Sequence, residues 1–133
     1  MQKLMYIELK TGYSDDGPAW IGYVKASKSG KTLYWNDHAF KRCNCIGGNF
    51  YDVETYEEYW ISGVKKDSCD RLFGKSCKTM IDRKAVREYL EYTGKKELDL
   101  KSFEIVEIDD VFPVERINKL MNRTSDYKNT VCH

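Results

Sequence analysis

Short runs of alternating apolar and polar residues, separated by turns, are the feature that most limits how this chain can fold. The first run is MYIELK, residues 5–10, and a period of two is typical of a strand with one buried face. Residues 20–26 and 32–35 form the next two runs, with a turn at 27–31 between them. We expect Gly30 to take a positive φ in that turn, because glycine adopts this conformation without steric cost.

Two further runs, residues 50–54 and 58–64, predict another hairpin. The segment 65–78 is polar and basic, so we expect it to be an exposed excursion from the strands. A last strand is predicted at 103–108.

One amphipathic helix is predicted over residues 83–93. Asp82 is a good N-cap, because its carboxylate can accept a hydrogen bond from an early backbone N–H. Ile81 and Val86 have the spacing of a hydrophobic staple around that cap. Gly94 stands where the left-handed residue that ends a helix is expected. A short second helix is expected within residues 113–122.

Strands and helices are segregated along the chain, which favours an α+β fold over a parallel α/β sheet. With five to six short strands, we expect a curved antiparallel sheet or a small barrel. A chain of 133 residues forms one ordinary domain. We place that domain at residues 1–124 and expect 125–133 to be a polar, flexible tail.

Composition excludes several classes of protein. The formal net charge is +1, so no global field marks a nucleic-acid or membrane protein. No stretch approaches the roughly 20 apolar residues of a membrane span, and the N-terminus alternates like a strand instead of resembling a signal peptide. We therefore expect a cytoplasmic protein with no membrane partner, and the odd count of five cysteines predicts reduced thiols.

Four segments resemble a group of small bacterial proteins with no established function. The resemblance covers about residues 5–113 and is carried by the segments MYIELKTGYSDDGPAWIGYVKASKSGKTLYW, GNFYDVET, EEYWISGVKKD and KTMIDRKAVREYL. Some members carry a name borrowed from deoxyxylulose-phosphate synthase. That name cannot describe a chain of 133 residues, which is too short for an enzyme that binds thiamine diphosphate across large domains. The resemblance therefore implies no chemistry.

This chain departs from that group at Tyr56, Cys69 and Cys77, where the group tends to have glycine. A tyrosine would be strained at a turn position with positive φ, so we expect the turn at Tyr56 to be rebuilt. The two cysteines look like local substitutions, which weakens the case for a metal site.

Motifs that could carry chemistry have simpler interpretations. The segment KSGKT, residues 28–32, resembles the end of a phosphate-binding loop, but a strand follows it and the first glycine is missing. The cysteines lack the C-x₂-C spacing that is common in zinc sites, and we expect no cofactor. A cysteine nucleophile with His38 as base, and acid–base catalysis by a carboxylate pair such as Asp109 and Asp110, stay open as minor alternatives.

Charge is polarised along the chain. Residues 65–87 hold eight basic and three acidic residues, a net +5, whereas residues 104–115 hold five acidic residues and no base, a net −5. A basic strip beside exposed aromatic rings can bind phosphate backbones and stack bases. The simpler interpretation is a solvated face that pairs internally with the acidic segment.

Thirteen of the 18 aromatic residues precede residue 74. Tyrosine and tryptophan favour half-buried positions and are enriched where proteins recognise partners. We therefore expect a non-catalytic binding module that acts through a protein partner, and an immunity-type role fits this. The alternatives are a nucleic-acid-binding module that uses residues 65–87, and a small enzyme with an unrecognised site. The candidate contact residues are Trp35, Trp60, Tyr23, Lys65, Lys66, Arg71, Lys75 and Lys78, and Tyr6 is a further ring expected on the less buried face.

Overall fold

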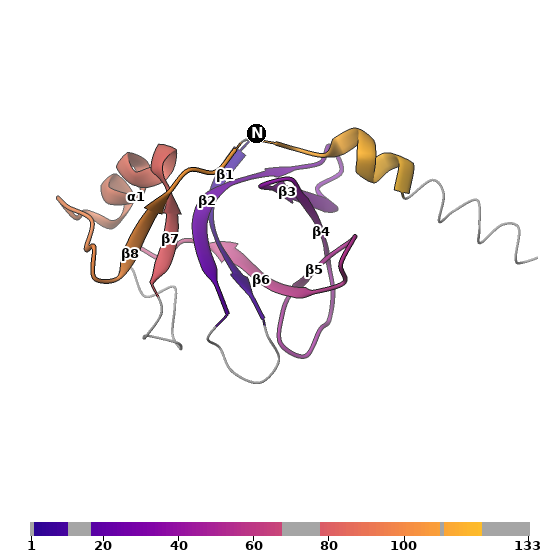
Figure 1. The fold of residues 1–133 in the computed structure, drawn as a ribbon, viewed down its shortest axis with the longest axis horizontal. Helices are drawn as coiled ribbons and strands as arrows, with labels where there is room; N and C mark the ends of the chain where they lie inside the picture. Colours follow the sequence, from indigo (N-terminus) through magenta and orange to yellow (C-terminus); the bar gives the residue numbers. More distant parts are fainter. Residues whose placement is uncertain (1, 11–16, 68–77, 110, 121–133) are drawn as a thin grey trace, which may run out of the picture.

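Six antiparallel strands close into a small barrel (Figure 1). The computed structural model describes residues 2–10, 17–67, 78–109 and 111–120. The barrel strands are β1 (Gln2–Leu9), β2 (Ala19–Ala26), β3 (Thr32–Trp35), β4 (His38–Arg42), β5 (Phe50–Asp52) and β6 (Glu58–Gly63). The α+β small-barrel fold expected from the sequence is thus confirmed.

β1 closes the barrel because it pairs with a neighbour on each side. Ile7 is opposite Trp20 of β2 and also opposite Ile61 of β6, and both pairings are antiparallel. The remaining strands follow in the order β6-β5-β4-β3-β2, so no barrel strand keeps an open edge along its whole length.

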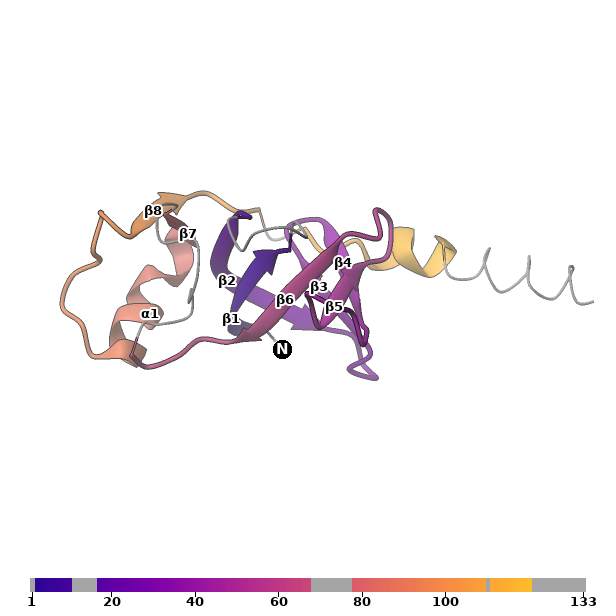
Figure 2. The ribbon, with the colours of Figure 1, turned by 90° about the horizontal axis from the view of Figure 1, so that it is seen from below.

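The sheet continues beyond the barrel through two parallel strands. β7 (Thr79–Asp82) runs parallel to β2, and β8 (Phe103–Val106) runs parallel to β7. The sequence predicted a strand at 103–108, where β8 lies, but neither β7 nor the parallel pairing. Between β7 and β8 lie the 3₁₀ turn η1 (Arg83–Ala85) and the helix α1 (Val86–Thr93). Figure 2, at right angles to Figure 1, shows α1 on the side of the barrel away from the second helix. The expectation of a purely antiparallel sheet is therefore incomplete.

Both predicted helices are present. The Asp82 carboxylate accepts a hydrogen bond from the Lys84 N–H at 3.0 Å, and Gly94 ends α1 with a φ of 73°. Residues 114–120 are helical, at the opposite end of the molecule from α1 (Figures 1 and 2). Within the described part of the chain, no helix is both long and apolar enough to cross a membrane.

Alternation along the barrel strands divides the apolar residues between two faces. One face fills the barrel, where Ile7, Val24, Trp35, Phe40 and Ile61 form a buried cluster. The other face of β1 and β2 contributes Leu4, Tyr6 and Ile21 to a second core, beneath α1, with Tyr89 from the helix. A third and smaller core lies beneath residues 114–120, where Ile117 packs against Tyr34, Ala39 and Val53.

Three turns between described barrel strands carry positive φ angles. Gly30 has a φ of 75°, as predicted, in the turn between β2 and β3. Asn36 and Asp37, with φ of 47° and 62°, join β3 to β4 as a two-residue hairpin turn. Tyr56 keeps a φ of 64°, so the prediction that its turn would be rebuilt is wrong. Its ring is exposed and stacks on Tyr51 with ring centroids 6.3 Å apart.

The loop between β4 and β5 holds Cys43 and Cys45, which are joined by a disulfide. The sequence predicted reduced thiols, and these two residues differ from that expectation. Their Cα atoms lie 5.3 Å apart, within the usual range for a disulfide. The remaining three cysteines, Cys69, Cys77 and Cys132, and the polar tail at 125–133 lie outside the described residues.

Candidate functional site

The strongest candidate site is a groove between α1 and the edge strand β8. It has a volume of about 630 Å³ and is lined by Arg83, Val86, Arg87, Leu90, Glu91, Gly94, Lys95, Lys96 and Ile105. We call it the α1–β8 groove. The N-cap at Asp82 starts the helical segment directly after β7, and Gly94 turns the chain back towards β8, so both groove walls come from one continuous stretch of sequence.

The floor of the groove is apolar. Val86 and Ile105 pack against the core beneath α1, yet each remains partly exposed. Leu90, one helical turn after Val86, is also half-buried. Apolar side chains left partly open beside a strand edge offer shallow sites for a partner's side chains.

The rim of the groove is basic. Arg83, Arg87, Lys95 and Lys96 stand around it with Glu91 as the one acidic lining residue, which leaves a net charge of +3. Arg83 forms an exposed ion pair with Glu107, the residue after β8. This pair supports in part the internal pairing of the basic and acidic segments, and it still leaves the other three cations on the rim.

β8 has one paired edge and one edge that lies away from the sheet. Thr79 donates its N–H to the Ser102 carbonyl at 2.9 Å. In a parallel ladder, successive residues direct their backbone groups in turn towards the partner strand and away from it, so this bond shows which residues of β8 face β7. In that alternation the N–H groups of Glu104 and Val106 face β7, and the N–H and C=O of Ile105 face the other way. Among the described residues, β8 pairs with β7 alone.

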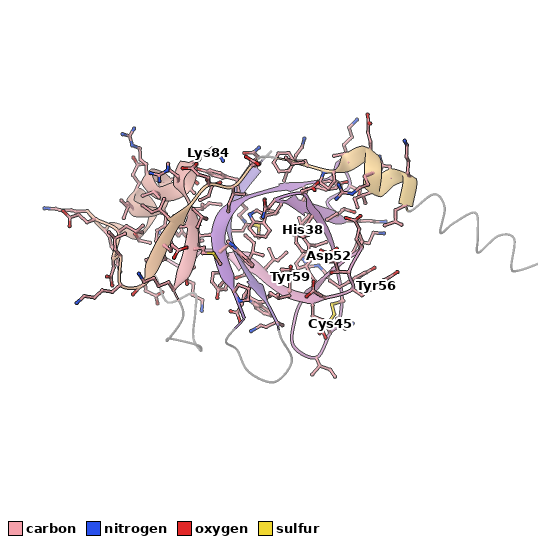
Figure 3. The ribbon with its side chains drawn as sticks, in the orientation of Figure 1. His38, Cys45, Asp52, Tyr56, Tyr59 and Lys84 are labelled. Carbon is pink, nitrogen blue, oxygen red and sulfur yellow. A yellow bond between two sulfur atoms is a disulfide. The ribbon has the colours of Figure 1, made fainter. Side chains whose placement is uncertain are left out.

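A second polar cluster lies at the barrel end near the β3–β4 turn. The fully buried Asp52 accepts hydrogen bonds from the N–H groups of Glu54 and Thr55, at 2.8 and 3.3 Å. Its other carboxylate oxygen lies 2.9 Å from Nδ1 of His38, and Figure 3 shows both side chains within the ring of strands. The two turn N–H groups and the His38 ring that contact Asp52 explain why a carboxylate is buried there.

Charges near this cluster act on Tyr59. Burial of the ring, followed by the negative charges of Glu57 and Asp52, raises the pKa of Tyr59 to about 12. On the outer surface, Arg116 donates hydrogen bonds to Glu54 and Asp37, which raise the pKa of Arg116 above its usual value. These contacts position the β3–β4 turn against the helix at 114–120.

The predicted aromatic contact residues divide into buried and exposed rings. Trp35 and Tyr6 are 2% and 1% exposed, so neither can contact a partner, contrary to expectation. The sequence could not distinguish them because both faces of β1 and β3 are covered. Tyr23 is half-buried and donates a hydrogen bond from its hydroxyl to Glu88 at 3.0 Å. Trp60 is 42% exposed on the outer face of β6 and stays a candidate.

The predicted basic contact residues are brought together only in part. Lys65, Lys66 and Lys78 are exposed, and Lys66 lies over the ring of Tyr92, with Nζ 5.7 Å from the ring centre. Arg71 and Lys75 lie outside the described residues. None of the three described lysines lines the α1–β8 groove. Of the groove's cations, Arg83 and Arg87 belong to the basic segment predicted at 65–87, whereas Lys95 and Lys96 were not predicted from the sequence.

The metal and nucleophile alternatives gain no support from the described residues. Within them, no group of three or more His, Cys, Asp or Glu side chains is placed to hold a metal ion. His38 is hydrogen-bonded to Asp52, and Cys43 and Cys45 are bonded to each other. The segment 28–32 forms the expected turn between β2 and β3.

Comparisons with known proteins give no match: no family model, curated protein or solved structure corresponds to this chain.

Proposed function

We propose that this chain is a protein-binding module that holds an extended, acidic segment of its partner in the α1–β8 groove. The observation that carries this proposal is the coincidence of an apolar floor, a basic rim and an open strand edge in one place. Each feature alone is common on protein surfaces. Together they match the requirements of strand addition, in which the main chain supplies affinity and the side chains supply specificity.

Main-chain hydrogen bonds would come from the outer edge of β8. A partner strand that lies beside β8 can pair with the N–H and C=O of Ile105, which face away from β7. The side chain of Ile105 lies on the groove floor, so alternate apolar side chains of the partner would reach Val86 and Leu90.

The charges of the rim favour an acidic partner. Arg87, Lys95 and Lys96 are exposed, so they can steer an anionic segment towards the groove and fix its register. Because the charges are at the rim and not buried, their contribution weakens as salt is added.

The same cations also favour a second candidate, a nucleic acid. Phosphate groups bind lysine and arginine without needing a strand edge. The described groove has an apolar floor and no exposed aromatic ring on its lining, so it lacks a stacking platform for bases. We therefore rank the acidic peptide first and treat DNA and RNA as competitors in the test.

A library of random short peptides displayed on phage tests the proposal. We expect the full chain to select sequences that alternate apolar residues with aspartate or glutamate. Binding of a selected peptide, measured by fluorescence polarisation, should weaken with salt and should not be displaced by short DNA or RNA. Failure to select any acidic peptide, or displacement by nucleic acid at equal concentration, would contradict it.

Two variants locate the site. Reversing the charges with Arg87→Glu and Lys95→Glu should weaken peptide binding by about tenfold or more, equivalent to about 1.4 kcal/mol. The matched control reverses Lys28 and Lys31, which are exposed in the β2–β3 turn, and should leave binding unchanged. Ile105→Pro removes an N–H from the outer edge of β8 without touching the β7 ladder, and it should also weaken binding. Equal loss in the control would assign the effect to overall charge and overturn the groove as the site.

A further inference from the structure

The disulfide between Cys43 and Cys45 does not have the position of a structural staple. Its two cysteines are separated by a single residue, Asn44, within the loop that joins β4 to β5. It therefore links neither two elements nor two distant parts of the chain. A disulfide stabilises a fold mainly by closing a loop of the unfolded chain, and the gain is smallest for the shortest loops.

The surrounding loop is fixed by contacts that do not involve sulfur. Cys43 donates its N–H to the Asn49 carbonyl at 3.0 Å. The Asn49 side chain exchanges two hydrogen bonds of 2.8 Å with the backbone of Ile61 in β6. Gly47 donates its N–H to the Glu58 carboxylate at 3.3 Å. The two ends of the loop would therefore keep their places if the disulfide opened.

The disulfide is also accessible. Cys43 and Cys45 are both partly exposed, and Asn44 between them is exposed. Ile46, the next residue, is fully exposed, and Figure 3 shows Cys45 on the loop at the barrel's lower rim. An external thiol can thus approach the sulfur atoms without unfolding the barrel.

From these three observations we propose that Cys43 and Cys45 form a reversible redox site that exchanges electrons with a thiol–disulfide couple. Thiols of the glutathione class supply the chemistry. The thiolate of one reductant molecule attacks one cysteine sulfur, which forms a mixed disulfide and breaks the Cys43–Cys45 bond. A second reductant thiolate attacks the mixed disulfide and releases the other cysteine. The protein gains two electrons and two protons, and two reductant thiols become one disulfide.

Tryptic peptides allow this site to be read separately from the other cysteines. Cleavage after Arg42 and Lys65 yields one peptide, residues 43–65, with both cysteines. Cys69, Cys77 and Cys132 each fall in a different peptide, namely 67–71, 76–78 and 129–133. Alkylation before digestion therefore reports the state of each cysteine by mass.

The experiment equilibrates the folded full chain in mixtures of reduced and oxidised glutathione. With oxidised glutathione in excess, we expect peptide 43–65 to carry no alkyl groups and to be two hydrogens lighter than the dithiol peptide. As the share of reduced glutathione rises, the peptide should become doubly alkylated. The fraction alkylated should follow a two-electron Nernst curve. Far-UV circular dichroism should be unchanged across the series, because the loop is held by Asn49 and Gly47. Cys45→Ser should trap a glutathione adduct on Cys43, and the matched variant Cys77→Ser should leave the curve of peptide 43–65 unchanged.

Two results would overturn the proposal. Double alkylation of peptide 43–65 even in oxidised glutathione alone would mean that the disulfide does not form in solution. Persistence of the disulfide in excess dithiothreitol, with the chain still folded, would mean that the bond is inert and structural.

Discussion

Gly48 lies where the loop after β4 returns to the barrel, and it passes very close to the backbone of β6. A Cβ atom added at Gly48 would lie 2.5 Å from the Tyr59 carbonyl oxygen, which is backbone and cannot rotate away. We expect Gly48→Ala to lower the free energy of unfolding by about 2 kcal/mol, which is the range of overpacking. Urea denaturation monitored by circular dichroism measures this.

Gly47 provides the control on the same loop. A Cβ there would meet the Lys10 Cβ at 3.6 Å, an ordinary contact. Gly47→Ala should therefore change the free energy of unfolding by less than about 0.5 kcal/mol. Equal losses of unfolding free energy in the two variants would show that the close approach to the Tyr59 carbonyl does not account for the effect of Gly48→Ala.

Tyr59 gives the fold a pH dependence in the alkaline range. Burial, with the negative charges of Glu57 and Asp52, raises its pKa from 10.0 to about 12 in the folded chain. The folded state therefore holds the phenolic proton more tightly than the unfolded state does. The stability linked to this proton is complete below pH 10 and is lost as pH rises from 10 towards 12.

The measurement compares the free energy of unfolding of the parent chain with that of Tyr59→Phe. We expect the parent to lose stability relative to the variant between pH 10 and pH 12, because phenylalanine carries no proton to lose. In an alkaline titration followed by tyrosinate absorbance, the variant should lack the ionisation that Tyr59 contributes near pH 12. A constant difference between the two proteins over this pH range would contradict the assignment.

At the scale of elements, Arg116 links the helix at 114–120 to the β3–β4 turn and to Glu54, in addition to the packing of Ile117. Arg116 donates to the Asp37 carboxylate and carbonyl, both at 2.8 Å, and to Glu54 at 2.9 and 3.2 Å. Arg116→Ala should loosen the helix and reduce amide hydrogen-exchange protection over 114–120 by about tenfold, since these pairs are largely exposed and each contributes little alone.

Lys119, exposed on the same helix, is the matched site. Lys119→Ala should leave the exchange rates of residues 114–120 within about twofold of the parent, because alanine is a good helix former. Similar loss in both variants would show that helix propensity, and not the contacts of Arg116, controls the docking.

Elements whose signals are local could be predicted from the sequence. The cap at Asp82 and the left-handed Gly94 mark the two ends of the helical segment formed by η1 and α1, and the alternation of residues 5–10 defines β1. β7 could not be found in this way. Its four residues follow a polar stretch, and its only described strand partners, β2 and β8, lie far away in sequence. Parallel pairing depends on such distant partners, so no local sequence pattern predicts it.

The α1–β8 groove was missed for a related reason. Each of its walls was predicted, the helix at 83–93 and the strand at 103–108, but not that they would lie side by side. Leu90 lies within the helix predicted at 83–93, and no local pattern shows that it remains half-exposed. Conversely, Trp35 was judged an exposed ring because the sequence does not reveal that the barrel closes over it.

At the scale of the whole molecule, β2 connects the barrel core to the core beneath α1. It pairs with β1, β3 and β7, and its two faces contribute Val24 to the barrel core and Ile21 to the core beneath α1. We therefore expect one cooperative unfolding transition. Tryptophan fluorescence, which includes the barrel residue Trp35, and circular dichroism at the helix band should give the same urea midpoint. Midpoints that differ would mean that the β7–α1–β8 unit unfolds separately from the barrel.

Barrel closure by β1 also has a consequence during synthesis. β1 leaves the ribosome before its partner β6, which begins at Glu58, about 50 residues after β1 ends at Leu9. At roughly 5–20 residues per second, the interval is roughly 2.5–10 s. Through that interval the nascent strand has an unpaired edge and an apolar face, so the growing chain is more exposed to aggregation and to chaperones than the finished protein.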